Sequence, residues 1–478
     1  MKYQPVIGLE IHAAVKTKTK MFCDSLNDPD EKRANWNVCP VCMGHPGTLP
    51  VINEEAVRKV ILTGLALNCT IARDTFFERK NYFYPDLPKG YQISQYQKPL
   101  CQNGVLEIPN SKKKIRITRI HLEEDAGRLT HHYHIPDTNK DYSLVDYNRA
   151  GVPLMELVTE PDFTNGQDVR AFAEEYQLIL KYIGASDADM EKGLMRVEVN
   201  ISLTKADGSY GTPVEIKNLN SISAAAFSVD YEIERQRKLL EEGGEVAKET
   251  RGWDENKKET FNQRSKEEAH DYRYFPEPDL PPLHFEDSDI EAIRKSLPEL
   301  PQQRFETLKN KYDISDAYVS ILVANRPLAK YFEDVVKSFN SKDLYKLAAN
   351  YLITELQKHD IDLEETHVLS GQFADLILRI SKKEISSSAA QTVIDEMVKT
   401  GSSPEQIIKE KNLGQVSDSG ALDLVVEAVI LANPKPVEDY KKGKEASLKF
   451  LIGMAMRESK GKGNPQVLEE IIRRKLGG

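Results

Sequence analysis

A proline-rich segment, FPEPDLPPL at 275–283, separates two parts of the chain that follow different hydrophobic patterns. Because proline blocks regular helix and strand, the segment predicts an extended connector or a structured loop. Before it, short alternating segments and turns rich in Pro, Gly, Asn and Asp indicate strands. From about residue 288 onward, apolar residues recur at helical spacing. The pattern therefore predicts an α+β protein with a strand-rich first part and all-helical units after it.

Periodicity places several strands and helices in the first part. The strands occur in groups and not in regular βα alternation, which favours a mainly antiparallel sheet over a doubly wound one. The expected strands are Val6–His12, Lys114–Leu122, Leu144–Tyr147, Arg196–Leu203 and Pro213–Leu219, and the expected helices include Glu54–Leu67, Gly166–Ile183 and Ala224–Glu242.

The length of 478 residues predicts about three domains. Helical spacing runs through Tyr318, Ile321 and Leu322, and the sequence Gly-Ser-Ser-Pro at 401–404 indicates a further boundary. We therefore expect a mixed domain at 1–290, a helical domain at 291–403 and a second helical domain at 404–478.

The composition is that of a globular protein, with 40% hydrophobic and 29% charged residues. The net charge of −10 argues against a protein coated in basic residues, although it leaves room for a local basic surface. No apolar run approaches the roughly 20 residues of a membrane helix. The N-terminal sequence lacks the pattern of a signal or transit peptide, so we expect a cytoplasmic protein without membrane contact.

Three of the expected strands have one apolar face and one polar face. Each polar face by itself is typical of a strand that meets water. If the strands share one sheet, carboxylates, an imidazole, a lysine and an amide converge on one surface, and this mixture suits Mg²⁺ and phosphate. The polar residues are Glu10 and His12, Glu198 and Asn200, and Glu215 and Lys217.

An acidic cluster, Glu123-Glu124-Asp125, follows the expected strand at 114–122. The apolar positions of that strand change from odd to even numbers, which predicts a bulge and leaves open which of Glu123 and Glu124 faces the site. The chain contains neither a P-loop motif nor a G-x-G-x-x-G motif. An ATP site here would therefore be of another type.

Three of the five cysteines lie close in the sequence: Cys23, Cys39 and Cys42. A structural zinc site normally has four ligands, so the fourth would be Asp24, His45 or water. The alternative is a set of buried or surface thiols without a metal. A redox role is disfavoured because no thioredoxin-like βαβ pattern surrounds the Cys-x-x-Cys sequence.

Basic residues outnumber acidic ones between 441 and 475. The pattern fits either a solvated helical surface or contact with the backbone of a folded RNA. Two glycines make the segment 460–462 a flexible basic loop. The candidate RNA-binding residues are Lys441, Lys442, Lys444, Arg457, Lys460 and Lys462.

Several long blocks of the chain resemble the signature sequences of the GatB/GatE family, whose GatB members belong to the GatCAB tRNA-dependent amidotransferases. The blocks are VIGLEIH (6–12), NYFYPDLPKGYQISQY (81–96), HLEEDAG (121–127), DYNRAGVPLMELVTEPD (146–162), EIKNLNS (215–221) and DYRYFPEPDLPPL (271–283). The resemblance covers the whole first half, and the C-terminal helical units fit the family in order and length. The chain is too short for the large insertion that is usual in GatE.

The resemblance implies an N-terminal cradle domain with an ATP and Mg²⁺ kinase site, a helical linking domain, and a tail domain similar to YqeY proteins that binds tRNA. It implies ATP-dependent amidation of mischarged Glu-tRNA(Gln), Asp-tRNA(Asn) or both. The family's partners in the GatCAB heterotrimer are an amidase (A) subunit, which supplies ammonia, and a small (C) subunit, which braces the complex. The family motifs imply a Mg²⁺ site at His12, Glu124 and Glu215. Asn148 and Arg149 lie in a further family block that is assigned to the same ATP site. The full set of residues that the motifs implicate in the ATP site is Glu10, His12, Glu123, Glu124, Glu198, Asn200, Glu215 and Lys217.

Two departures from the family pattern concern the metals. Many relatives have a second cysteine two residues after the first zinc cysteine, where this chain has Ser25. Relatives commonly read Arg-Cys-Asp-Ala before Asn200, where this chain reads Arg-Val-Glu-Val, so Glu198 carries its carboxylate on a longer stem. Two rival interpretations remain: a non-catalytic RNA-binding scaffold, and a zinc-dependent nucleic-acid module.

Overall fold

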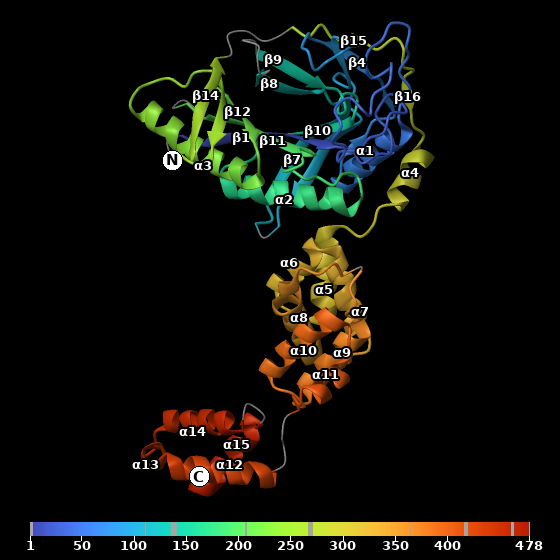
Figure 1. The fold of residues 1–478 in the computed structure, drawn as a ribbon. Coiled ribbons are helices and arrows are strands. Elements are labelled where there is room, and N and C mark those ends of the chain that lie inside the picture. The colour runs from blue at the N-terminus through green and yellow to red at the C-terminus, as the bar shows by residue number, and fades with distance from the viewer. Residues whose placement is uncertain are drawn as a thin grey trace. The chain divides into compact units, whose positions relative to one another are not determined.

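The structure is a computed structural model that describes residues 3–109, 111–134, 141–205, 208–265, 271–363, 365–414, 419–459 and 463–477. Its internal contacts divide the chain into two compact units, Met1–Gln302 and Gln303–Gly478. The first unit is strand-rich and the second is helical (Figure 1). The predicted α+β class is therefore confirmed, while the three-domain division stays a prediction.

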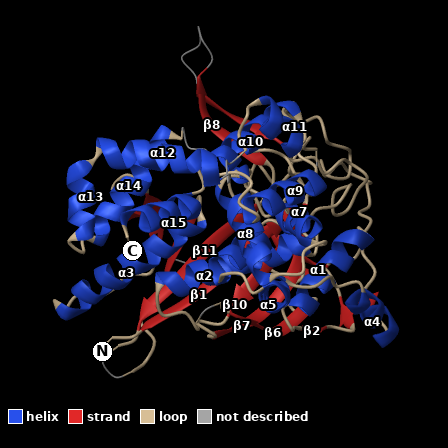
Figure 2. Cartoon of the chain, turned by 90° about the horizontal axis from the view of Figure 1, so that it is seen from below, coloured by secondary structure: helices blue, strands red, loops and turns tan. Residues whose placement is uncertain are grey.

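The described part of the first unit is built on a nine-stranded sheet. Its strands are β1 (Pro5–Ala14), β2 (Thr70–Ile71), β6 (Cys101–Glu107), β7 (Lys114–Glu124), β10 (Pro153–Thr159), β11 (Met195–Leu203), β12 (Val214–Leu219), β13 (Glu249–Asp254) and β14 (Glu259–Ser265). The order is β14-β13-β12-β11-β1-β10-β7-β6-β2, and Figure 2 shows the part from β11 to β2 side by side. Neighbours pair antiparallel except β12 and β13, which confirms the predicted mainly antiparallel sheet.

Helices cover one face of this sheet. They are α1 (Glu54–Ala66), α2 (Gly166–Tyr182) and α3 (Ile222–Glu241), and their apolar sides form one buried core with the strands. Each begins where a side chain accepts a hydrogen bond from the first turn: Asn53 caps α1, Asn165 caps α2 and Ser221 caps α3. All three helices were predicted within two residues of these bounds.

Three small sheets accompany the large one in the described residues of the first unit. They contain β4 (Glu78–Asn81), β5 (Tyr91–Ser94) and β15 (Phe275–Pro276); β3 (Asp74–Thr75) and β16 (Leu283–His284); and β8 (Arg128–His134) and β9 (Asp141–Asp146). In Figure 1, β8, β9, β4 and β15 lie on the side of the large sheet opposite α2 and α3. The proline-rich segment is a structured loop, because its two ends pair with β4 and β3. The helix α4 (Asp287–Lys295) follows it.

The second unit consists of helices in its described residues. They are α5 (Pro301–Tyr312), α6 (Asp316–Ala324), α7 (Arg326–Val336), α8 (Lys342–Thr354), α9 (Ser370–Ser381), α10 (Ser387–Thr400), α11 (Pro404–Glu410), α12 (Ser419–Ala432), α13 (Pro434–Lys441), α14 (Glu445–Glu458) and α15 (Pro465–Leu476), with a short 3₁₀ helix at Leu356–His359. Residues of α12, α14 and α15 share a small apolar core, which includes Leu422, Leu451 and Ile472. Among the described residues, no helix has both the length and the apolar character needed to cross a bilayer.

Candidate functional site

The polar residues predicted on separate strands lie on one face of the large sheet. β1 lies between β10 and β11, with His12 opposite Glu156 on one side and Glu10 opposite Glu198 on the other. The next strand continues the face, because Asn200 of β11 pairs with Glu215 of β12. The opposite face is apolar and packs against the helices, as Ile7, Leu9, Ile11, Val197 and Val199 are fully or almost fully buried. Burial of one face thus fixes which side chains point to the other.

His12 lies at the centre of a group of carboxylates. Its Nε2 atom is 3.4 Å from Glu156 Oε2, 3.5 Å from Glu123 Oε1 and 3.8 Å from Glu10 Oε1. The ligand atoms of Glu10, His12 and Glu156 lie within 4.8 Å of one another, close enough for one metal ion. A second such group, formed by His121, Glu123 and Glu156, shares Glu156 with the first.

The charges in this group perturb one another strongly. Burial disfavours a charged His12, but a hydrogen bond with Glu156 and the charges of Glu123, Glu156 and Glu10 outweigh it and raise the pKa of His12 to about 9. Burial also opposes the charge of Glu156, yet His121, His12 and Arg119 hold the pKa of Glu156 well below its usual range. Burial and the charge of Glu156 raise the pKa of Glu10. The face is therefore rich in carboxylates that a bound cation would stabilise.

Lys217 lies at the other end of this polar face. Its Nζ atom is 2.6 Å from Glu198 Oε2 and 3.2 Å from Glu215 Oε1. Burial disfavours the ammonium, but Glu198 and then Glu215 outweigh that effect and raise the pKa of Lys217. Thr250 donates a hydrogen bond to Glu215 from β13. Lys217 is therefore a fixed positive charge beside the carboxylates.

The structure distinguishes Glu123 from Glu124, because only one of them lies on the polar face. The pairing of β7 with β10 shifts register near Thr159, so the expected irregularity is present. Glu123 lies 3.5 Å from His12, on the polar face. Glu124 is buried in an ion pair with Lys89, with 2.5 Å between Nζ and Oε1, and also accepts a hydrogen bond from the backbone of Ile93. The chain thus brings Glu123, and not Glu124, into contact with His12.

Two residues of this group, His121 and Glu156, were not predicted. His121 is in β7 with its Nε2 atom 3.6 Å from Glu156 Oε2. Glu156 is the one charged residue in β10, a strand that is buried on nearly every position. A lone carboxylate in an apolar run was the available signal, but β10 itself was missed because a strand buried on both faces shows no alternation.

The residues of the 146–162 block occupy a neighbouring position. The buried carboxylate of Asp125 accepts hydrogen bonds from Arg149 and from Arg196 of β11. Asn148 holds the loop beside it, since it accepts from the backbone of Asn37 and donates to a carbonyl. A cavity of about 770 Å³ opens here, and Arg149, Arg196 and Glu198 are among its lining residues.

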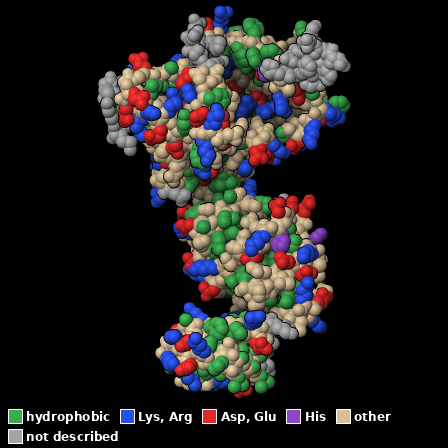
Figure 3. Space-filling view, turned by 60° about the vertical axis from the view of Figure 1, so that its left-hand side comes forward, with side chains coloured by type: hydrophobic (Ala, Val, Ile, Leu, Met, Phe, Trp, Pro, Cys, Tyr) green, Lys and Arg blue, Asp and Glu red, His purple; other side chains and the backbone are tan. Residues whose placement is uncertain are grey.

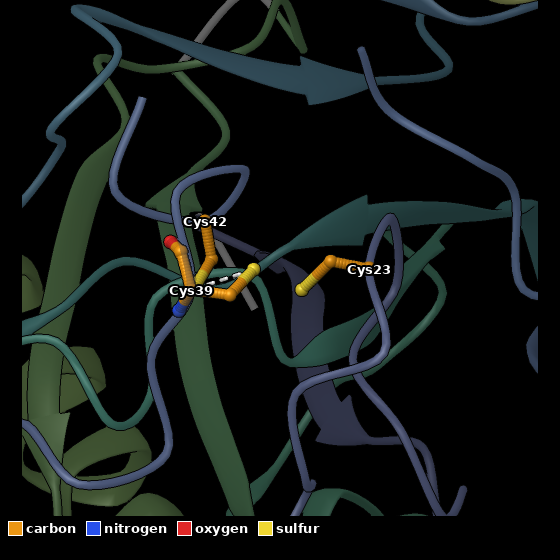
Figure 4. A group of neighbouring side chains, drawn as sticks. All are labelled: Cys23, Cys39 and Cys42. Carbon is orange, nitrogen blue, oxygen red and sulfur yellow. Dashed lines mark hydrogen bonds between the residues drawn. The ribbon is translucent and has the colours of Figure 1, made fainter. Parts of the chain in front are cut away.

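The three predicted cysteines lie together. Cys42 Sγ is 3.9 Å from Cys39 Sγ, and all three sulfur atoms lie within 4.8 Å of one another (Figure 4). A hydrogen bond from Cys23 is the main cause that lowers the pKa of Cys42 to about 4, and Lys20 contributes. Among the described residues, no His, Asp or Glu joins this group as a fourth ligand.

The tail carries basic residues mixed with acidic ones. Lys441, Lys442, Lys444 and Arg457 are exposed, whereas Lys460 and Lys462 lie outside the described residues. Lys442 forms an ion pair with Glu438, and Lys444 forms one with Asp439. Figure 3 shows Lys, Arg, Asp and Glu side chains interspersed on the visible face of the helical unit.

Comparison with known proteins identifies the family. Residues 5–291 match the family described as the GatB/GatE catalytic domain, and residues 330–476 match the GatB domain. The chain belongs to the GatB/GatE family. The predicted resemblance is thereby confirmed, and every residue of the polar face lies within the match to the catalytic domain.

Curated relatives match over the full length. The chain is 46% identical to the B subunit of the aspartyl/glutamyl-tRNA(Asn/Gln) amidotransferase of Caldicellulosiruptor saccharolyticus over 100% of this chain and 99% of the relative. It is 45% identical to the protein of that name from a Thermotoga species and 46% identical to that from Persephonella marina, over 100% of both chains in each case.

Proposed function

We propose that this chain activates the side-chain carboxylate of Glu-tRNA(Gln), Asp-tRNA(Asn) or both with ATP, so that ammonia can convert it to an amide. The observation that carries the proposal is the single polar sheet face on which Glu10, His12, Glu123, Glu156 and Lys217 meet. The relatives, each named as the B subunit of a tRNA amidotransferase, support the same activity.

The donor set of this face fits Mg²⁺. Carboxylate oxygens are the ligands that Mg²⁺ prefers, and burial followed by repulsion from Glu156 already raises the pKa of Glu10. We assign the ion to His12, Glu10 and Glu156, with Glu123 beside them. Although burial opposes it, a hydrogen bond with Glu156 and the neighbouring carboxylate charges raise the pKa of His12 to about 9, so the ion would have to displace the proton of His12 when it binds. The family resemblance also implied Glu124 and Glu215 as ligands, but Glu124 forms an ion pair with Lys89 and Glu215 forms one with Lys217. When bound, Mg²⁺ neutralises charge on the phosphates of ATP.

The reaction proceeds in two transfers. A carboxylate oxygen of the substrate attacks the γ-phosphorus, the bond to the β–γ bridging oxygen breaks, and ADP leaves. Ammonia then attacks the acyl carbon, inorganic phosphate leaves, and the nitrogen loses a proton. The carboxylate needs no general base because it is ionised at about pH 7. The protein's contribution is placement and charge stabilisation, and Lys217 is positioned to stabilise phosphoryl oxygens.

The remaining parts of the reaction need partners. The sequence has no amidase-type nucleophile segment, so we assign the supply of ammonia to an amidase (A) subunit, while a small (C) subunit would brace the complex. The domain at 1–290 would hold the reaction site and the helical domain at 291–403 would connect it to a tail at 404–478. We assign contact with the tRNA backbone to exposed basic residues of that tail, in the cytoplasm, where charged tRNA is used.

Zinc at the cysteine group is a separate proposal. Cys23, Cys39 and Cys42 would supply three thiolate ligands, and water would supply the fourth. The low pKa of Cys42 favours the thiolate that zinc binds, whereas the hydrogen bond to Cys42, followed by burial, raises the pKa of Cys23, so zinc would have to displace the proton of Cys23. This site would stabilise the fold and take no part in the chemistry.

An isotope experiment tests the activation step. The complex with its partner subunits receives ATP, ammonia and Glu-tRNA(Gln) whose side-chain carboxylate carries ¹⁸O, and mass spectrometry follows the inorganic phosphate. We expect one ¹⁸O atom per phosphate released, and no ATP cleavage by a His12→Ala variant that still binds tRNA. Unlabelled phosphate, or normal amidation by the variant, would contradict the proposal.

A further inference from the structure

Two sequence blocks have no role in the chemistry above, yet the chain brings them together. The segment 81–96 and the segment 271–283 are about 190 residues apart, and they form one small sheet in which Phe275 pairs with Arg79. The backbone of Asn81 donates to the carbonyl of Tyr272, and its side chain donates to Tyr272 and Arg273. The fold therefore builds one surface from both blocks.

This surface carries a continuous row of aromatic rings, which we call the tyrosine platform: Tyr82, Tyr96, Tyr272 and Tyr274. Tyr96 stacks on Tyr274 with 4.6 Å between centroids and 15° between planes. Tyr272 meets Tyr274 and Tyr82 edge to face, each at 6.1 Å. None of the four belongs to the buried core of the described first unit. Packing of the core therefore does not explain the row.

Cations are interleaved with the rings. Lys80 Nζ lies 5.0 Å from the ring centre of Tyr272, and the guanidinium of Arg119 lies 5.1 Å from that of Tyr96. Aromatic faces with interleaved cations are the elements with which proteins hold unpaired nucleotides, because every base offers a face for stacking and every phosphate a negative charge.

The platform adjoins the polar sheet face directly. Arg119, which covers Tyr96, also places Nη2 3.5 Å from Glu156 Oε1. Burial, followed by the charges of Glu123 and Glu156, raises the pKa of Tyr274, so its ring remains neutral beside the carboxylates. A ligand lying on the platform would thus end at the reaction site.

Tyr96 is both open and firmly held. The residue is 49% exposed. Its backbone N–H donates to the buried carboxylate of Glu78, 3.0 Å away, which also accepts from Gln97. Further exposed rings, Phe83 and Tyr84, lie in the same block.

We propose that the tyrosine platform binds the unpaired 3′ nucleotides of the substrate tRNA by base stacking and so delivers the aminoacyl end to the polar sheet face. This inference rests on the proposed function, because only an aminoacyl-tRNA substrate must bring its 3′ end to Glu156. The adenine of ATP is the competing occupant, and the test separates the two.

The test compares intact tRNA with tRNA trimmed of its unpaired 3′ nucleotides, using the assembled complex. Tyr96→Ala should weaken binding of intact tRNA by about 5- to 160-fold, the range for loss of one stacked base, and leave binding of trimmed tRNA unchanged. Tyr96→Phe keeps the ring and should bind as the unmodified complex does. Tyr210→Ala, which removes a tyrosine that is 72% exposed in the loop between β11 and β12 and outside the tyrosine platform, is the matched control.

Three results would overturn the inference. They are equal losses for intact and trimmed tRNA, no loss for either, or weaker binding of ATP in the absence of tRNA, which would place the adenine of ATP on the platform. If ¹⁸O is transferred to phosphate while one of these three results is obtained, the proposed function stands and only the role of the tyrosine platform in tRNA binding is refuted.

A second measurement needs no variant. Intact tRNA with 2-aminopurine in place of its terminal adenine should lose fluorescence on binding to the unmodified complex, since stacking quenches this base. Unchanged fluorescence at saturation would also overturn the inference.

Discussion

Replacing Glu156 by Gln probes the polar face most directly. The amide keeps the shape of the side chain but removes one negative charge located 3.4 Å from His12 Nε2 and 3.6 Å from His121 Nε2. Two unit charges about 4 Å apart interact by about 4 kcal/mol at an effective dielectric constant of about 20. Since His12 and Glu10 remain to hold the metal, with Glu123 beside them, we expect the free energy of Mg²⁺ binding to weaken by about 2–4 kcal/mol.

This loss predicts an increase of about 30- to 700-fold in the Mg²⁺ concentration for half-maximal activity. The assay is tRNA-dependent ATP cleavage by the assembled complex, titrated with Mg²⁺ at saturating Glu-tRNA(Gln). Glu175→Gln is the matched control, because it removes a buried carboxylate from α2 on the other side of the sheet. A shift of less than about threefold for Glu156→Gln, or an equal shift for the control, would refute the assignment of Glu156 to the metal.

Three further changes have defined outcomes. Burial raises the pKa of Glu175 to about 7 from 4.5, so the folded state keeps this proton longer than the unfolded state and the stability of the fold falls as pH rises from about 4.5 to 7. Thermal melting should therefore show that Glu175→Gln stabilises the fold by up to about 3 kcal/mol at pH 8 and by little at pH 4.5. Lys217→Met should lower the rate of ATP cleavage by about 100-fold or more with little change in tRNA affinity, measured by single-turnover kinetics and filter binding, and a normal rate would exclude the role in phosphoryl stabilisation. Deleting 405–478 should weaken tRNA binding but leave glutaminase activity of the partner intact, and unchanged tRNA affinity would remove the proposed role of the tail.

Much of the site could be predicted because its strands are buried on one side only. In β1, β11 and β12 the apolar face packs on helices while the other face stays polar, so alternation revealed Glu10, His12, Glu198 and Lys217. The helices of the first unit were predictable for a similar reason, since capping residues and an apolar side mark their limits.

The rest depends on tertiary packing that leaves no local signal. β10 lies between β1 and β7 and is buried at nearly every position, so its sequence is an apolar run without the alternation that would mark Glu156 as a site residue. The sequence alone does not decide whether Glu123 or Glu124 contacts His12. A register shift in the pairing of β7 with β10 changes which residues of β7 point to the polar face. The tyrosine platform could not be foreseen, because it joins two segments about 190 residues apart.

The most direct test of the polar face is the position of its metal. Crystals of the assembled complex grown with Mn²⁺ and a non-hydrolysable ATP analogue give an anomalous signal for the ion. We expect the peak within coordination distance of His12 and Glu156, with the γ-phosphate of the analogue beside it. A peak at another position, with these two side chains contacting neither ion nor phosphate, would contradict a metal-nucleotide site on this sheet.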